Sequence, residues 1–189
     1  MSGRPVDFSK LRILIVENHA LMRRLLREML RGFGIEQAVE ARSVPEAFEQ
    51  IYREPFDAVI LDFFLGPLDG ADFSRRVRLD PGCRNRRTPI LLITGQPDHQ
   101  KVLKARDAGI DDLLAKPIAP KDLYWRLHRM LTAPQPFVVT DWYAGPRRDL
   151  TRKLEPAASV PPDVARIVNF TANRNLPEDD VEIDEDLFA

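Results

Sequence analysis

Short apolar runs alternate with amphipathic segments along the first 132 residues. The apolar runs lie at residues 11–16, 37–41, 57–61, 89–93 and 112–115, and most have the Ile, Leu and Val content of strands buried on both faces. Helical spacing predicts helices over 20–31, from Ser43 onward, over 71–78, over 98–108 and from Pro120 to about 131. In the first helix, we expect an apolar stripe made of Leu21, Leu25, Met29 and Leu30.

Alternation of this kind is typical of a parallel sheet with helices on both faces. The carboxyl ends of the strands meet at one edge of such a sheet, which is where ligands bind. The polar residues that follow the apolar runs are Glu17, Asn18, Asp62, Thr94 and Lys116. We expect these five side chains to converge, although each alone would be ordinary as a strand-end carboxylate, a turn, a helix cap or a surface lysine.

These residue types suit phosphoryl transfer. The oxygens of Glu17, Asn18 and Asp62 are the kind of ligand that Mg²⁺ prefers. Asp62 can act as a carboxylate nucleophile and form an acyl phosphate, while Lys116 and the Thr94 hydroxyl can contact other phosphoryl oxygens. Catalysis of phosphoryl transfer consists mostly of positioning and charge stabilisation, and this set supplies both.

Four motifs, in the order given, resemble the receiver domain of two-component response regulators. They read Ile-Leu-Ile-Val-Glu-Asn-His, Asp-Ala-Val-Ile-Leu-Asp-Phe-Phe-Leu-Gly-Pro-Leu-Asp-Gly, Pro-Ile-Leu-Leu-Ile-Thr-Gly and Ala-Gly-Ile-Asp-Asp-Leu-Leu-Ala-Lys-Pro. The resemblance covers roughly residues 10–132 and implies a flavodoxin-like fold with a five-stranded parallel sheet. It implies a chemotaxis-regulator-like, stand-alone receiver in which a histidine kinase or phosphotransfer protein phosphorylates Asp62. Thr94 is then the switch hydroxyl and Lys116 the phosphoryl contact.

The resemblance also implies a Mg²⁺ site formed by Glu17, Asn18, Asp62 and the backbone carbonyl of Phe64. The family usually has two carboxylates where this sequence has Glu17 and Asn18, so we expect weaker metal binding. Many members have an aromatic residue that reports phosphorylation at the position of Leu113, so we expect an altered output switch. These departures leave open a degenerate receiver that acts as an interaction module without phosphorylation.

Other classes that share this sheet fit less well, and we expect no enzyme activity beyond phosphoryl transfer to the chain itself. Aspartate-nucleophile phosphatases need a second aspartate two residues after the first, where Phe64 stands. A flavin-binding protein needs a Ser/Thr-rich phosphate loop after the first strand, where Glu17, Asn18 and His19 stand.

Composition and charge indicate which classes of partner and which cellular compartment are expected. The net charge of -1, from 28 basic and 29 acidic residues, is not typical of a nucleic-acid binder. No apolar run approaches the roughly 20 residues of a membrane span. The single cysteine fits a reducing compartment. We expect a cytoplasmic protein whose partners are a kinase or phosphotransfer protein and a downstream protein, with neither nucleic acid nor membrane.

Charge and proline content divide the chain near residue 132. The first part carries 22 Lys and Arg against 18 Asp and Glu, whereas residues 133–189 carry 6 against 11 and seven of the sixteen prolines. We predict an N-terminal lead (1–9), a receiver domain (10–132) and an irregular, acidic, partly disordered tail (133–189). Truncation after residue 132 is then expected to leave a folded domain.

The last predicted helix offers a candidate partner surface. Its leucine stripe should face the sheet, which puts Tyr124, Trp125 and His128 toward solvent or a partner protein. The sequence leaves open that the aromatic residues within 137–143 fold back and cover this surface.

Overall fold

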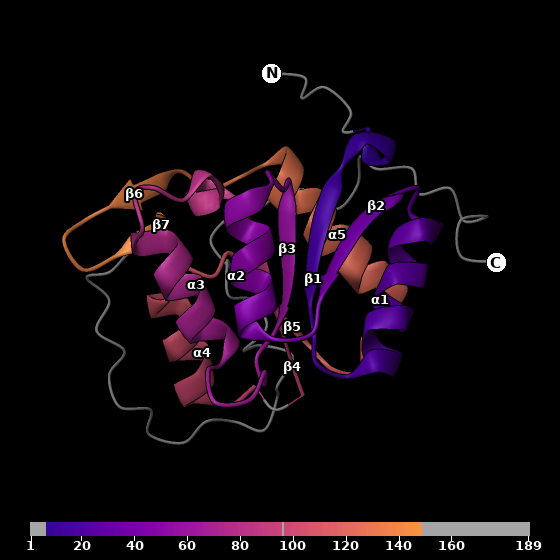
Figure 1. The fold of residues 1–189 in the computed structure, drawn as a ribbon, viewed down its shortest axis with the longest axis horizontal. Coiled ribbons are helices and arrows are strands. Elements are labelled where there is room, and N and C mark those ends of the chain that lie inside the picture. Colours follow the sequence, from indigo (N-terminus) through magenta and orange to yellow (C-terminus); the bar gives the residue numbers. More distant parts are fainter. Residues whose placement is uncertain (1–6, 96, 149–189) are drawn as a thin grey trace.

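The computed structural model describes residues 7–95 and 97–148, which form a five-stranded parallel sheet with helices on both faces (Figure 1). In chain order the strands are β1 (Arg12–Val16), β2 (Gln37–Ala41), β3 (Ala58–Asp62), β4 (Ile90–Thr94) and β5 (Asp112–Ala115). Their order across the sheet is β2-β1-β3-β4-β5. The predicted flavodoxin-like fold is confirmed, and each strand begins and ends within one residue of its expected bounds.

Five helices follow the strands: α1 (Ala20–Gly32), α2 (Val44–Arg53), α3 (Gly70–Leu79), α4 (His99–Asp107) and α5 (Pro120–Thr132). α1 and α5 cover one face of the sheet, and α2, α3 and α4 cover the other. Strand residues alternate between these faces, so Leu14 and Val16 join one core while Ile13 and Ile15 join the other. No helix within the described ranges combines the length and apolar character that a membrane span requires.

The predicted apolar stripe of α1 is wrong in its first half. Leu26 and Leu30 are buried against the sheet, whereas Leu21 and Leu25 are 68% and 43% exposed. The sequence contains two overlapping apolar stripes because Leu25 and Leu26 are adjacent. Packing against β1 and β2 selects the stripe that contains Leu26.

Past α5 the chain forms an antiparallel hairpin of β6 (Phe137–Val139) and β7 (Ala144–Pro146), which packs against α3 (Figure 1). Tyr143 is 1% exposed, and its hydroxyl donates to the carbonyl oxygen of Pro146 at 2.7 Å. Gly145 and Gly109 approach so closely that a Cβ on Gly145 would lie 2.7 Å from the Cα of Gly109.

The end of α5 coincides with the predicted boundary near residue 132, but the hairpin beyond it packs on the same domain. The rest of the predicted tail, 149–189, lies outside the described residues, as does the lead before residue 7.

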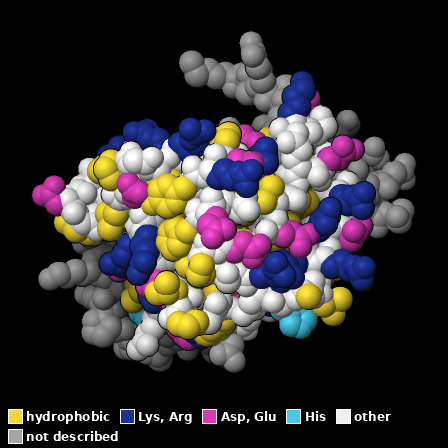
Figure 2. Space-filling model, in the orientation of Figure 1, with side chains coloured by type: hydrophobic (Ala, Val, Ile, Leu, Met, Phe, Trp, Pro, Cys, Tyr) yellow, Lys and Arg dark blue, Asp and Glu magenta, His cyan; other side chains and the backbone are white. Residues whose placement is uncertain are grey.

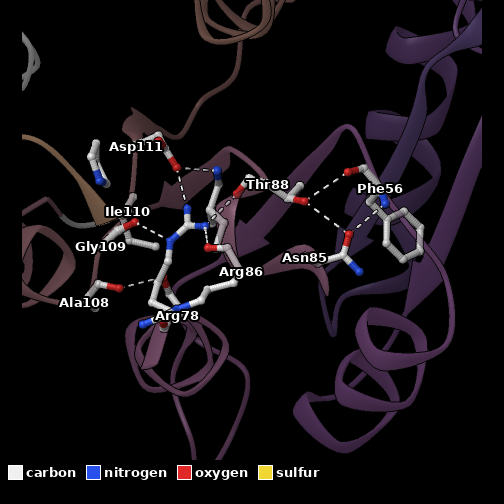
Figure 3. Close-up of polar contacts among 12 residues, drawn as sticks. Phe56, Arg78, Asn85, Arg86, Thr88, Ala108, Gly109, Ile110 and Asp111 are labelled. Atoms are coloured by element: carbon white, nitrogen blue, oxygen red, sulfur yellow. Dashed lines mark hydrogen bonds and ion pairs between the residues drawn. The ribbon is translucent and has the colours of Figure 1, made fainter. Parts of the chain in front are cut away.

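Arg78 of α3, only 1% exposed, lies at the centre of a polar network beneath this hairpin (Figure 3). Its guanidinium donates to the carbonyl oxygens of Gly109 and Thr88 at 2.9 and 2.8 Å and pairs with the Asp111 carboxylate at 2.6 Å. The ring of Phe137 lies over the guanidinium, with its centroid 5.5 Å from Cζ. The network joins α3, the approach to β4, the α4–β5 loop and the hairpin.

Candidate functional site

The carboxyl ends of β1, β3 and β5 bring Glu17, Asp62 and Lys116 together. The Lys116 ammonium lies 2.9 Å from Glu17 Oε2 and 3.0 Å from Asp62 Oδ1. Because β3 is the central strand, Asp62 lies between the ends of β1 and β4. One cation therefore bridges two carboxylates that belong to neighbouring strands.

Both carboxylates are almost completely buried, with Glu17 2% and Asp62 5% exposed. Burial raises the pKa of Asp62, the Glu17 charge raises it further, and Lys116 opposes both effects. Burial alone would lower the pKa of Lys116, but the hydrogen bonds and charges of Glu17 and Asp62 outweigh it and raise this pKa. With all three groups ionised, the pocket carries a net negative charge that a cation would compensate.

Thr94 ends β4, on the strand between Asp62 and Lys116, and is fully buried at 0% exposed. Its carbonyl oxygen accepts the backbone N–H of Lys116 at 2.8 Å. Asp62 pairs in register with Ile93, so Thr94 lies one residue beyond the partner of Asp62.

Asn18 and Phe64 lie at the exposed rim of the site. Within the described residues, no hydrogen bond joins the Asn18 side chain to Asp62 or Glu17. Phe64 is 51% exposed, and the Lys101 ammonium of α4 lies 5.1 Å from its ring centroid. The structure thus gathers Glu17, Asp62 and Lys116 through direct contacts, and places the other predicted residues around them by backbone position.

Arg23 of α1 is a site-supporting residue that the sequence reasoning missed. Its side chain is 11% exposed and donates to the carbonyl oxygens of Glu17 and Asn18 at 2.8 and 3.1 Å. It also pairs with Glu40 of β2 at 3.4 Å. Arg23 therefore holds the loop that carries two predicted site residues. No sequence signal indicated this role, because Arg23 is one of several arginines off the predicted apolar stripe and cannot be told from Arg24 by its spacing.

The donor set fits a hard divalent cation. Glu17 and Asp62 supply buried carboxylate oxygens, and the Asn18 amide and Phe64 carbonyl are oxygen donors at the same end of the sheet. Mg²⁺ keeps several waters and needs only one or two protein carboxylates. Residues 7–95 and 97–148 hold no cluster of three or more His, Cys, Asp or Glu side chains arranged for a metal.

Leu113 of β5 is 2% exposed and belongs to the core beneath α2, α3 and α4. A leucine here fills the core but offers neither a hydroxyl nor a ring that could move between two positions. The side chain at this position therefore has no polar group through which it could respond to the state of Asp62.

Tyr124, Trp125 and His128, the candidate partner surface on α5, are half-buried. Phe8 stacks on Tyr124 and His128 with ring centroids 5.4 and 6.2 Å apart, and burial lowers the pKa of His128. The cover comes from a 3₁₀ turn near the N-terminus, η1 (Phe8–Lys10), whereas the hairpin packs against α3. The described part of this surface is therefore partly occupied by the chain itself.

Comparisons with known proteins agree with this geometry. The model of the response regulator receiver domain family matches residues 13–128. Chemotaxis protein CheY-3 of Vibrio cholerae is 27% identical over 120 residues, which are 64% of this chain and 91% of that protein. The DNA-binding response regulator MtrA of Mycobacterium bovis is 32% identical over 126 residues, 67% of this chain but only 53% of that protein.

Solved structures give the same result. A putative response regulator from Chloroflexus aurantiacus is 36% identical, with a TM-score of 0.59, and the match covers 64% of this chain and 97% of that one. The receiver domain of the sensor histidine kinase PA1611 from Pseudomonas aeruginosa is 28% identical with a TM-score of 0.58, covers the same shares, and has a magnesium ion coordinated in its active site cleft. The β6–β7 hairpin lies beyond the residues that the family model matches.

Proposed function

We propose, because the chain belongs to the response regulator receiver domain family, that Asp62 accepts a phosphoryl group from a histidine kinase or a phosphotransfer protein. The phosphorylated domain then signals through protein contacts. The observation that carries the proposal is the Lys116 ammonium between the buried carboxylates of Asp62 and Glu17, at 3.0 and 2.9 Å. A nucleophilic carboxylate, a second carboxylate and a cation at one sheet edge are the parts that such a transfer requires.

In the proposed reaction, a carboxylate oxygen of Asp62 attacks the phosphorus atom of the donor. The P–O bond to Asp62 forms as the P–N bond to the donor histidine breaks, and the histidine nitrogen keeps that electron pair. Lys116 exchanges its contact with the Asp62 carboxylate for one with a phosphoryl oxygen. The Thr94 hydroxyl, on the neighbouring strand, donates to another phosphoryl oxygen. Both interactions strengthen as negative charge moves onto these oxygens.

Mg²⁺ belongs to this proposal as the cofactor. Glu17, Asp62, Asn18 and the backbone carbonyl of Phe64 would hold it. When bound, it reduces the repulsion between the carboxylate and the phosphoryl oxygens. The net negative charge of the two buried carboxylates and one ammonium supports this assignment.

The test is phosphoryl uptake from acetyl phosphate in the presence of Mg²⁺, followed by intact mass spectrometry and peptide mapping. The chain should gain the mass of one phosphoryl group on Asp62, and the gain should require Mg²⁺. Asp62→Asn should abolish uptake. Asp122→Asn, at an exposed carboxylate of α5, is the matched control and should retain it. Uptake that persists in Asp62→Asn would refute the assignment of the acceptor.

Output through protein contacts is part of the proposal. The described residues that follow α5 form a hairpin on the receiver body and not a second core. The partners are accordingly a kinase or phosphotransfer protein upstream and an unidentified protein downstream. A cytoplasmic location is also part of the proposal, because the single cysteine, 3% exposed, fits a reducing compartment.

A degenerate receiver, which binds partners without phosphorylation, is a second candidate because of two observations. Position 18 carries an exposed amide in place of a carboxylate. Leu113 is buried in the core and has no polar group that could respond to Asp62. Under this alternative, the acetyl phosphate assay gives no mass gain, and Asp62→Asn binds the downstream protein as the unsubstituted chain does.

Asn18→Asp should tighten Mg²⁺ binding several-fold, because it adds a carboxylate to a pocket that already holds Glu17 and Asp62. The expected gain is about 1 kcal/mol, the scale of one partly solvated charge interaction. Isothermal titration calorimetry with MgCl₂ measures it. Gln37→Glu, an exposed substitution at the opposite end of the sheet where β2 begins, adds the same charge away from the site and should leave the affinity unchanged. Equal affinities for both variants would show that residue 18 does not face the metal.

A further inference from the structure

α1 presents an exposed outer face beside the candidate site. Leu21 and Leu25, one turn apart, are 68% and 43% exposed. Arg24, Arg27 and Arg31 form a second exposed row next to them. Figure 2 shows basic, acidic and apolar side chains close together over α1. A shallow hollow of about 370 Å³ opens along the arginine row.

The arginine row keeps a net positive charge. Arg27 pairs with Glu40 at 3.2 Å and Arg31 with Glu28 at 3.7 Å. In the part of the chain that the structure describes, Arg24 makes no ion pair. Exposed pairs of this kind contribute little stability, so these arginines can exchange one carboxylate for another. A ligand complementary to this face has acidic and apolar side chains in close succession.

We infer that residues 178–188 of this same chain dock on the outer face of α1. The segment reads Glu-Asp-Asp-Val-Glu-Ile-Asp-Glu-Asp-Leu-Phe, with seven acidic residues, four apolar residues and no basic residue. Its carboxylates complement the arginine row, and its apolar side chains complement Leu21 and Leu25. The apolar contacts are needed as well as the charge pairs, because exposed charge pairs alone are weak in salt.

The length of the chain permits this contact. Arg148, the last described residue, follows the hairpin on the α3 side of the sheet, whereas α1 covers the other face (Figure 1). The 29 residues between Arg148 and Glu178 can span about 100 Å when fully extended. A domain of this size has a radius of gyration of only about 14 Å. Because the segment is tethered, its effective concentration at α1 reaches the millimolar range, so a weak contact suffices.

Docking there has a regulatory consequence, which rests on the proposed function. α1 begins at Ala20, three residues after Glu17, and Leu21 lies in its first turn. A segment on this face therefore lies beside the entrance to Asp62 and competes with any protein that delivers a phosphoryl group. Its carboxylates also repel phosphoryl oxygens. The docking itself does not depend on phosphorylation, so it is tested without a phosphoryl donor.

The experiment uses the full chain with a nitroxide spin label on Ala189→Cys. Cys83 is 3% exposed and should stay unlabelled, which the unsubstituted chain, treated in the same way, checks. Amide signals of α1 should lose at least half of their intensity through paramagnetic relaxation, whereas those of α3, on the other face, should not. Undiminished α1 signals overturn the proposal. Loss that disappears on dilution with unlabelled chain also overturns it, because the contact is then between molecules.

Two substitution sets test the chemistry of the contact. Arg24→Gln with Arg31→Gln should remove most of the relaxation effect on α1, whereas Arg75→Gln with Arg76→Gln, two exposed arginines of α3, should not. Replacing the seven acidic residues of 178–186 by Asn and Gln should remove the effect without altering the described body. An effect that survives this neutralisation overturns the proposal. If docking is observed but acetyl phosphate never modifies Asp62, the proposed function fails and the docking stands.

Discussion

Ending the chain at Thr132 should lower the free energy of unfolding by about 3 kcal/mol, because it removes a hairpin that covers buried groups. Tyr143 is 1% exposed, and emptying a packed aromatic site costs about 3 kcal/mol or more. Phe137 no longer covers the Arg78 guanidinium, and Arg148 no longer donates to the α4–β5 loop. This loss is a large fraction of the 5–15 kcal/mol typical of a domain. Truncation after residue 132 is still expected to leave a folded domain, but one of lower stability.

Urea denaturation of three chains measures the effect. Ending the chain at Arg148 keeps the hairpin and the Arg148 contact, and should retain most of the free energy of unfolding that ending it at Thr132 loses. Tyr143→Ala and Trp142→Ala form a matched pair, since these neighbours are 1% and 64% exposed. The first should cost about 3 kcal/mol and the second almost nothing. Equal stability of the two truncated chains would show that the hairpin adds nothing to the domain.

The sheet could be predicted from the sequence because most of its strands are covered on both faces and are mainly apolar. β3 and β4, in which every residue is buried, are the clearest cases. β2 gives a weaker signal because it lies at the edge of the sheet and only Ala41 is buried. Local capping chemistry located α2, where the Ser43 hydroxyl accepts the backbone N–H of Glu46.

The centre of the site could also be predicted, since the carboxyl ends of parallel strands share one edge. Position after an apolar run was enough to find Glu17, Asp62 and Lys116. Arg23 and Lys101 could not be found in this way, because they reach the site from helices and their direction depends on how each helix packs. The same reason explains why the sequence did not decide between Leu25 and Leu26 on α1.

The local signal for the hairpin was limited to the aromatic residues within 137–143, which left open that this segment packs on the domain. Its strands have three residues each and contain Gly145 and Pro146, so the segment resembles a linker in composition. Its stability comes from tertiary contacts with Arg78 and Gly109, which lie far away in the sequence. The burial of Arg78 could not be predicted either, because nothing in the sequence next to it distinguishes it from the exposed Arg75.

Arg78→Met should lower the free energy of unfolding by about 3–5 kcal/mol, the usual result when one partner of a buried ion pair is removed. The variant leaves the Asp111 carboxylate without its cation and the carbonyl oxygens of Gly109 and Thr88 without the guanidinium donors. Arg75→Met, at an exposed position of the same helix, should change the free energy by less than about 0.5 kcal/mol. Urea denaturation at neutral pH compares the two.

The titration of Asp111 shows whether Arg78→Met loses stability through electrostatics or through packing. Burial raises the pKa of Asp111, and Arg78 is the main group that opposes this rise. Without Arg78 the pKa rises further, so the folded state binds a proton more tightly than the unfolded state does. The loss in free energy of unfolding caused by Arg78→Met is therefore largest above the raised pKa of Asp111, and it becomes smaller as the pH falls through that pKa.

Arg78→Met combined with Asp111→Asn should recover part of the free energy of unfolding at neutral pH. The double variant should also lose this pH dependence, because no carboxylate is left to titrate. If the double variant is no more stable than Arg78→Met at any pH, the network stabilises the domain through packing and the carbonyl contacts, and the ion pair contributes nothing.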